Sequence, residues 1–330
     1  MDRPTPTGRT VPLFGYASLF VALAGALLFG LKSGDVPITF SELFKLLRTG
    51  PNAQIDDLFK ASVLWQIRIP RVAATTISGA ILASSGVIFQ AVLRNPLAEP
   101  YTLGVASGAA FGAACAIVAG VSWVTGASFV GSILALFVVW LLGERKGETD
   151  ISRIILAGVI VGSILSAGLT LLKALAGEKV SAIVIWLMGS FSAAGWNDVR
   201  PLAYSLLFLL LLCLSHTREL DIMASGTDAR ALGIDLSRSR IVLLGGASLA
   251  VSFVVSRFGV IGFVGLVVPH LLRILFGPSH SRLFSLSVLG GSALLCAADS
   301  IAKGWNELPA GVLTVLIGGP IFCLLLWNRR

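Results

Sequence analysis

Two arginines separated by a proline are the residues of this chain whose types and spacing most suggest chemistry. Arg68 and Arg71 flank Pro70 at the start of a long apolar run. Positive charge is mildly unfavourable at a helix N-terminus, so the stability of the helix does not explain the pair. Anchoring to lipid headgroups would explain it, because long basic side chains extend from apolar surroundings towards charged groups. The residues alone leave other roles open.

The remaining groups that could do chemistry form no known catalytic or metal motif in the sequence. There is no G-x-x-x-x-G-K-[ST] phosphate loop, and the chain contains no Gly-Lys pair at all. His216, His270 and His280 have no H-E-x-x-H or G-x-S-x-G motif and no paired carboxylates beside them. The four cysteines stand apart inside apolar runs. We therefore expect a non-catalytic chain that binds no metal and no cofactor of its own.

The composition places the chain in a membrane. Of its 330 residues, 55% are hydrophobic and 13% are charged, whereas about a quarter of the residues of a soluble protein are charged. A bilayer core requires about 20 apolar residues per helix. Ten apolar windows, some of them short, predict an all-α polytopic membrane protein of about ten transmembrane helices: Phe14–Leu31, Val72–Leu93, Leu103–Val121, Ala127–Leu142, Ile151–Ala176, Leu202–Leu214, Ile241–Val255, Ile261–Phe276, Leu283–Ala298 and Leu308–Trp327.

The distribution of charge indicates the orientation. An even number of helices puts both termini on one side of the membrane, and the tails carry Arg3, Arg9, Arg329 and Arg330. The positive-inside rule assigns such tails to the cytoplasm. The net charge of +8 suits contact with anionic lipid. The basic residues form no stripe with interleaved aromatic residues, so we expect no nucleic-acid partner.

An outer segment, residues 32–71, precedes the second predicted helix within a single domain, residues 1–330. Thr39 and Glu42 have the spacing of a capping box. A short amphipathic helix follows, which we expect to lie along the outer membrane surface. Contact with a partner protein is the alternative role for this helix.

Two further polar segments interrupt the predicted helices. Residues 177–201 contain too many glycine, serine and asparagine residues to span a bilayer, and they predict a short half-inserted helix followed by a loop at the outer mouth. Residues 216–240 are highly charged but hold apolar residues around Gly233, as a short helix with one apolar face would. A solvated loop would not need those apolar residues.

Five motifs together resemble a known family. They are R-x-P-R at 68–71, R-N-P-L-A-E-P at 94–100, A-x-x-L-G at 229–233, G-F-V-G-L-V-V-P-H at 262–270 and E-L-P-A-G at 307–311. From the second predicted helix to the C-terminus the chain resembles the bacterial permeases that import iron chelates, haem and cobalamin with ATP. The resemblance implies a fold like that of the type II ABC importer permeases.

The resemblance also implies roles for particular residues. Arg68 and Arg71 would dock the substrate-binding protein, with Lys303 as a third basic residue, although headgroup anchoring ranks first for Lys303. From the residues alone, Asn95-Pro96 is also an ordinary turn and Ser152 an ordinary helix cap. The remaining implied sites are a cytoplasmic gate of Asn95, Leu97, Ile151 and Ser152, an ATPase-coupling site of Asp228, Ala229, Arg230, Leu232 and Gly233, and an outer vestibule of Trp186, Ser190, Phe191 and Ser192.

The function implied by the resemblance is import by alternating access. A homodimer in the bacterial inner membrane would carry an iron chelate (siderophore or haem) or a corrinoid along its two-fold axis. It would work with two ATPase subunits, which use ATP and Mg, and with one periplasmic or lipid-anchored binding protein. An ion-coupled secondary transporter is the alternative, and a structural or signalling subunit is a third possibility. Ion coupling would require acids within the bilayer, whereas the acids here lie nearly all in loops, with Asp299 and Glu307 near outer helix ends.

Overall fold

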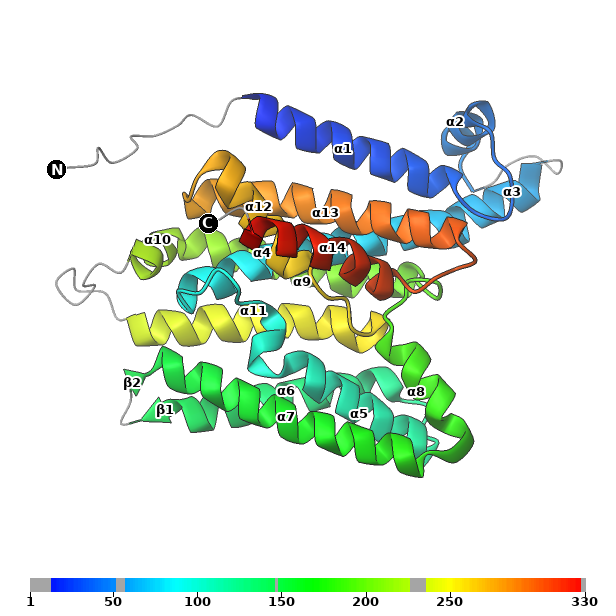
Figure 1. The fold of residues 1–330 in the computed structure, drawn as a ribbon. Helices are drawn as coiled ribbons and strands as arrows, with labels where there is room; N and C mark the ends of the chain where they lie inside the picture. The colour runs from blue at the N-terminus through cyan, green and yellow to red at the C-terminus, as the bar shows by residue number, and fades with distance from the viewer. Residues whose placement is uncertain (1–12, 52–56, 146–147, 226–235, 328–330) are drawn as a thin grey trace.

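The computed structural model describes residues 13–51, 57–145, 148–225 and 236–327. These residues form a bundle of roughly parallel and antiparallel helices (Figure 1). The long helices are α1 (Leu13–Lys32), α4 (Ile69–Val92), α6 (Val124–Gly143), α7 (Ile151–Leu175), α9 (Trp196–Ser215), α11 (Leu236–Phe258) and α13 (His280–Gly304). The shorter apolar helices are α5 (Val105–Ala119), α12 (Val264–Phe276) and α14 (Ala310–Trp327).

The remaining elements are short and lie at the two ends of the bundle or in its turns. They are α2 (Phe40–Thr49), α3 (Leu58–Ser62), η2 (Val63–Arg68), η3 (Pro100–Leu103), η4 (Gly177–Lys179), α8 (Val180–Leu187), α10 (Thr217–Ser225), β1 (Glu144–Arg145) and β2 (Glu148–Thr149). The two strands pair antiparallel, with Glu144 opposite Thr149. Following the predicted orientation, we call the end with α10 and the strands the inner end, and the end with α2, α3 and α8 the outer end (Figure 1).

The all-helical membrane architecture agrees with the sequence-based prediction, but the structure does not settle the number of membrane-spanning helices. Each of the ten predicted windows falls on one of the ten apolar helices. Within the described residues, seven helical stretches are long and apolar enough to cross a bilayer. The other three windows fall on α5, α12 and α14, which are shorter in their described parts. The count of about ten transmembrane helices is therefore not confirmed.

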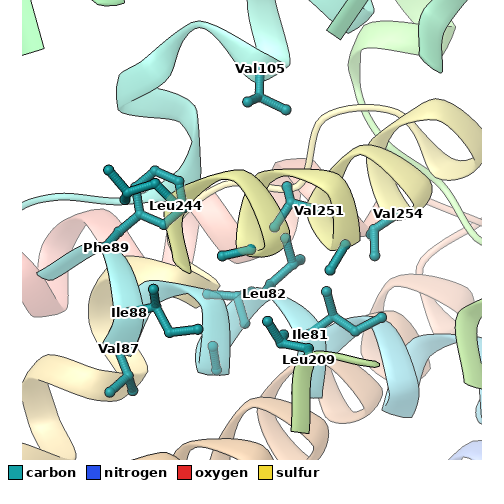
Figure 2. Close-up of a cluster of buried hydrophobic side chains, with 14 of the residues drawn as sticks. Ile81, Leu82, Val87, Ile88, Phe89, Val105, Leu209, Leu244, Val251 and Val254 are labelled. Atoms are coloured by element: carbon teal, nitrogen blue, oxygen red, sulfur yellow. The ribbon is translucent and has the colours of Figure 1, made fainter. Parts of the chain in front are cut away.

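Helix α4 forms the centre of the core. Every residue from 78 to 92 is buried, and Ile81, Leu82 and Phe89 pack against side chains of α9 and α11 (Figure 2). Small residues let the neighbouring helices approach closely, which lipid alone would not drive. A Cβ on Gly79 would lie 2.2 Å from the carbonyl oxygen of Gly291 in α13, so the backbones of α4 and α13 touch at this point.

Two helices start inside the bundle, which explains why they are short. Gly265, the second residue of α12, lies against Gly86 of α4. Tyr101, in the turn before α5, donates a hydrogen bond to the carbonyl of Ile261 at 2.8 Å and accepts one from its N–H at 3.1 Å. These bonds satisfy the N–H and the carbonyl of Ile261, which lies in non-helical chain. The loops before α5 and α12 are thereby joined to each other.

In the outer segment, the helix cap agrees with the sequence-based prediction, whereas the packing of the helix differs from it. Thr39 and Glu42 form the predicted capping box at the start of α2. Leu43 and Leu46, two apolar residues of this amphipathic helix, are buried against α3 and η2, while Phe40 and Phe44 are exposed. Contact of this helix with lipid stays a prediction, and Phe40 and Phe44 are the side chains left to make it.

Candidate functional site

A buried ion-pair cluster lies at the outer ends of α4 and α13. Arg71 donates from Nε to Asp299 Oδ2 at 2.8 Å and from Nη2 to Asp299 Oδ1 at 3.1 Å. Its Nη1 donates to both carboxylate oxygens of Glu307, at 2.8 and 3.0 Å. The side chains of Arg71 and Asp299 are 4% and 5% exposed, and that of Glu307 is 44% exposed. One carboxylate is therefore enclosed with the guanidinium, and the other can reach water.

Arg71 also holds a turn in a conformation that is unfavourable for its residues. Asn306 and Glu307 have φ values of 57° and 56°, in the left-handed region, which costs a residue with a side chain roughly 1 kcal/mol or more. The turn leads into α14, where the N–H of Gly311 donates to the carbonyl of Gly189 at 3.0 Å. The ion pair with Glu307 thus helps to set where α14 begins.

Arg68 and Lys303 lie beside the C-terminal end of α1. Arg68 donates to the carbonyls of Leu31 and Lys32, both at 2.9 Å, and to that of Val36. Lys303 Nζ lies 3.5 Å from the carbonyl of Gly30. The last carbonyls of a helix have no partner within the helix, and a cation there also suits the helix dipole. Both basic side chains are buried.

The structure therefore brings the three predicted docking residues together, but with partners in their own chain. Arg68, Arg71 and Lys303 are all buried at the outer end. Docking of a second protein stays a prediction for them. The sequence did not reveal that Asp299 and Glu307 pair with Arg71. The available signal was that ionisable residues in membrane segments usually pair with one another.

Three of the four predicted vestibule residues, Ser190, Phe191 and Ser192, form a turn between α8 and α9, whereas Trp186 lies in α8 and packs against the main core. The ring of Phe191 is fully buried and lies 4.4 Å from that of Phe258. The N–H of Ser190 donates to the carbonyl of Phe258 at 2.8 Å. The hydroxyl of Ser190 donates a hydrogen bond to the hydroxyl oxygen of Ser192 at 3.1 Å, and Ser192 is exposed. Phe191 thus anchors the turn, and Ser192 is left facing outward.

The predicted gate residues lie in two turns at the inner end. Asn95 Oδ1 accepts a hydrogen bond from the N–H of Leu97 at 2.9 Å, which leaves the Leu97 side chain 46% exposed. The second turn begins α7, where Asp150 caps the helix by accepting from the N–H of Ser152 at 2.9 Å. The interpretation of Ser152 as the cap is therefore wrong, because Asp150 precedes it with the acceptor. A gating role stays a prediction for all four residues.

Glu99 is a residue of this region that the sequence did not single out. It begins η3, where its side chain accepts from the backbone N–H of Thr102. Burial raises the pKa of its carboxyl to about 7. A carboxyl with such a pKa changes charge near neutral pH, which is a property of many functional sites.

Helix α7 carries a polar stripe on an exposed face. Ser163, Ser166 and Thr170 are exposed, at the three- and four-residue spacing that places side chains on one face of a helix. Ser163 donates to the carbonyl of Val159, and Thr170 to that of Ser166. The hydroxyls of Ser163 and Thr170 are thus satisfied within the helix, and all three residues face away from the chain's own core. The predicted coupling residues Asp228, Ala229, Arg230, Leu232 and Gly233 lie outside the described residues.

Comparisons with known proteins agree with this architecture. The model of the FecCD transport family matches residues 21–328. The chain is 38% identical to the cobalamin import system permease protein BtuC of Halobacterium salinarum, over 81% of this chain and 74% of that protein. It is 32% identical to the molybdate import system permease protein MolB of Haemophilus influenzae, over 96% of each chain.

A solved structure supports the same assignment. It is described as an inward-facing conformation of a metal-chelate type ABC transporter, and it matches with a TM-score of 0.84 and 30% sequence identity over 96% of this chain and 99% of the other. Family model, relatives and fold agree over nearly the whole length. The chain belongs to the FecCD transport family, the non-catalytic, membrane-spanning permease subunits of ABC importers that leave ATP hydrolysis to a separate subunit.

Proposed function

We propose that this chain, as a homodimer, imports an iron chelate (siderophore or haem) or a corrinoid by alternating access. The resemblance to a cobalamin permease and to a metal-chelate transporter supports this choice of substrate. The molybdate permease among its relatives shows that similar chains carry other cargo. A bulky, largely rigid metal complex is thus the class to test first, with molybdate as the contrasting substrate.

The exposed polar stripe of α7 is the observation that carries the proposed pathway. Three exposed hydroxyl residues along one helix face favour a water-filled path over contact with lipid alone, because polar residues in membrane helices usually face a cavity or the interior of the bundle. The stripe begins above the predicted gate residues Ile151 and Ser152 of the same helix. In a homodimer, two such faces across a two-fold axis would form a polar passage that closes at its inner end.

Partners are proposed for both ends. Two ATPase subunits would bind the segment 216–240, and one periplasmic or lipid-anchored binding protein would dock at the outer end. Because Asp299 and Glu307 of the same chain enclose Arg71, an acidic residue of the binding protein would reach Arg71 by displacing Glu307, the more exposed of the two carboxylates. The protein would lie in the bacterial inner membrane with both termini in the cytoplasm.

Ion-coupled transport without an ATPase is the second candidate. A coupling ion needs an ionisable side chain that is free to bind it within the membrane. Asp299 is instead held by two hydrogen bonds from Arg71. This arrangement leaves Asp299 unsuited to bind a coupling ion.

A block of the proposed passage tests the function. Ser166→Trp should abolish uptake of the transported complex into proteoliposomes that contain the ATPase and the binding protein, because it fills a narrow polar path. Leu134→Trp is the matched control, since Leu134 is 57% exposed on α6 and outside the stripe. A ferric siderophore, haem, cobalamin and molybdate are compared as substrates. Equal uptake by the two tryptophan variants would reject the α7 pathway.

A further inference from the structure

Helix α10 lies within residues 216–240, the segment that is proposed to bind the ATPase. It occupies Thr217–Ser225 at the inner end, directly before that segment continues beyond the described residues (Figure 1). Leu220 and Met223 are fully buried in the main core. One face of α10 is therefore packed against the bundle, although the helix is short and polar elsewhere.

The first polar contact joins α10 to the inner end of α4. Arg94 Nε donates to the carbonyl of Met223 at 2.7 Å. Met223 lies in the last turn of α10, where the carbonyls have no helical partner and where a cation suits the helix dipole. Arg94 has a φ of 49°, an uncommon conformation for a residue with a side chain. The chain thus accepts backbone strain at the position that makes this contact.

The second polar contact joins α10 to the inner end of α13. Asp221 Oδ1 lies 2.8 Å from His280 Nδ1 and accepts the backbone N–H of His280 at 3.3 Å. His280 is the first residue of α13, so its N–H is one of the groups that the helix itself cannot satisfy. A carboxylate at this N-terminus is also favoured by the helix dipole. Asp221 therefore caps α13 from α10.

The two helices that α10 contacts are tied together along their length. At the outer end Arg71 of α4 pairs with Asp299 of α13. Further inward, Ser292 donates to the carbonyl of Thr76 at 2.9 Å, and Gly79 and Gly291 bring the two backbones into contact. The α4–α13 pair thus runs from the outer charge cluster to the two contacts with α10.

We propose that Arg94, Asp221 and His280 are positioning residues that clamp α10 to the α4–α13 pair, so that movement of the ATPase is passed to the helices of the permease. The inference rests on the proposed function. Energetic coupling between distant sites is carried by packed, rigid elements and hydrogen-bond networks. Without the clamp, α10 would follow the ATPase while α4 and α13 stayed in place, and ATP would be hydrolysed without transport.

The test measures substrate molecules transported per ATP hydrolysed, in proteoliposomes with the complete importer. The double variant Arg94→Asn and Asp221→Ala removes both polar contacts, and asparagine tolerates the left-handed backbone at position 94. We expect assembly with the ATPase and ATP hydrolysis to persist while the ratio falls about fivefold or more, the range of typical coupling free energies. Glu144→Ala is the matched control, because Glu144 is an exposed charged residue at the inner end and lies outside the segment 216–240, and it should leave the ratio unchanged.

Each outcome decides the matter. An unchanged ratio, or hydrolysis and transport that fall in parallel, would overturn the clamp. If the double variant does not assemble, the two single variants are judged by the same criterion. Loss of assembly in the single variants would also overturn it, since the contacts would then serve folding alone. ATP-dependent uptake by the wild-type importer is measured alongside, and its absence would reject the proposed function instead.

Discussion

Replacing Arg71 by methionine probes the outer charge cluster directly. Methionine keeps much of the apolar volume of the side chain and removes the charge. Asp299, which is 5% exposed, would then be a buried carboxylate without its cation. Removal of one partner of a buried pair costs about 3–5 kcal/mol, because the remaining charge is left unpaired. We therefore expect Arg71→Met to destabilise the chain by that amount.

The two carboxylates should differ in their contribution. Asp299→Asn leaves Arg71 with Glu307, so its cost should be that of lost charged hydrogen bonds, about 1.5–3 kcal/mol. Glu307→Gln should cost at most about 1 kcal/mol, because the Glu307 side chain is 44% exposed and exposed pairs contribute only about 0.2–1 kcal/mol. The double variant Arg71→Met with Asp299→Leu should recover most of the stability, since a buried pair replaced by apolar residues is often neutral.

Unfolding of the purified chain in detergent micelles measures these differences. Arg200→Met is the control for loss of a positive charge, because Arg200 is exposed at the start of α9, and it should change stability by no more than about 0.5 kcal/mol. An Arg71→Met variant as stable as this control would refute the enclosed ion pair. A Glu307→Gln variant as unstable as Arg71→Met would refute the different roles of the two carboxylates.

Three further predictions concern the core, the inner turn and the partner. Gly79→Ala should lower the free energy of unfolding by about 1–3 kcal/mol in the same assay, because its Cβ would lie 2.2 Å from a backbone oxygen of α13. Gly25→Ala, whose Cβ would have nothing within 4 Å, should be neutral or stabilising. Equal effects of the two substitutions would contradict the close contact. Burial raises the pKa of the Glu99 carboxyl to about 7, so the wild type loses stability as pH rises from about 4.5 through 7. Glu99→Gln should therefore stabilise the chain by on the order of 1 kcal/mol at pH 8 and by less at pH 5. An effect that does not depend on pH would contradict the raised pKa. The isolated chain should hydrolyse no ATP, and hydrolysis by a contaminant-free preparation would show that it has a nucleotide site of its own.

The sequence predicted those features that depend on neighbouring residues. Apolar windows located the ten apolar helices, because membrane helices require long apolar runs. The capping box of Thr39 and Glu42 was also predicted, since both partners lie within one turn. The number of true spans was not predictable in this way. Whether α5 and α12 begin inside the bundle depends on Tyr101 meeting Ile261, and these residues are 160 positions apart.

The candidate site was predictable only in part for the same reason. Arg68 and Arg71 were recognised from their motif, but their partners were not. Asp299 lies 228 residues from Arg71, and Arg68 binds backbone carbonyls, which leave no trace in the sequence. The cap of α7 shows a local error: Ser152 has the right residue type, but Asp150 is in the position from which the side chain reaches a free N–H.

The central claim is that this permease moves its cargo only when a separate ATPase hydrolyses ATP. Uptake of a ferric siderophore, haem or cobalamin is measured in proteoliposomes that hold the permease dimer and the binding protein, with and without the ATPase, and with ion gradients either imposed or dissipated. We expect uptake only when the ATPase is present and ATP is supplied on the side of the membrane where the ATPase lies. Dissipating the ion gradients should leave this uptake unchanged. Uptake that follows an imposed proton or sodium gradient and needs no ATPase would contradict this claim.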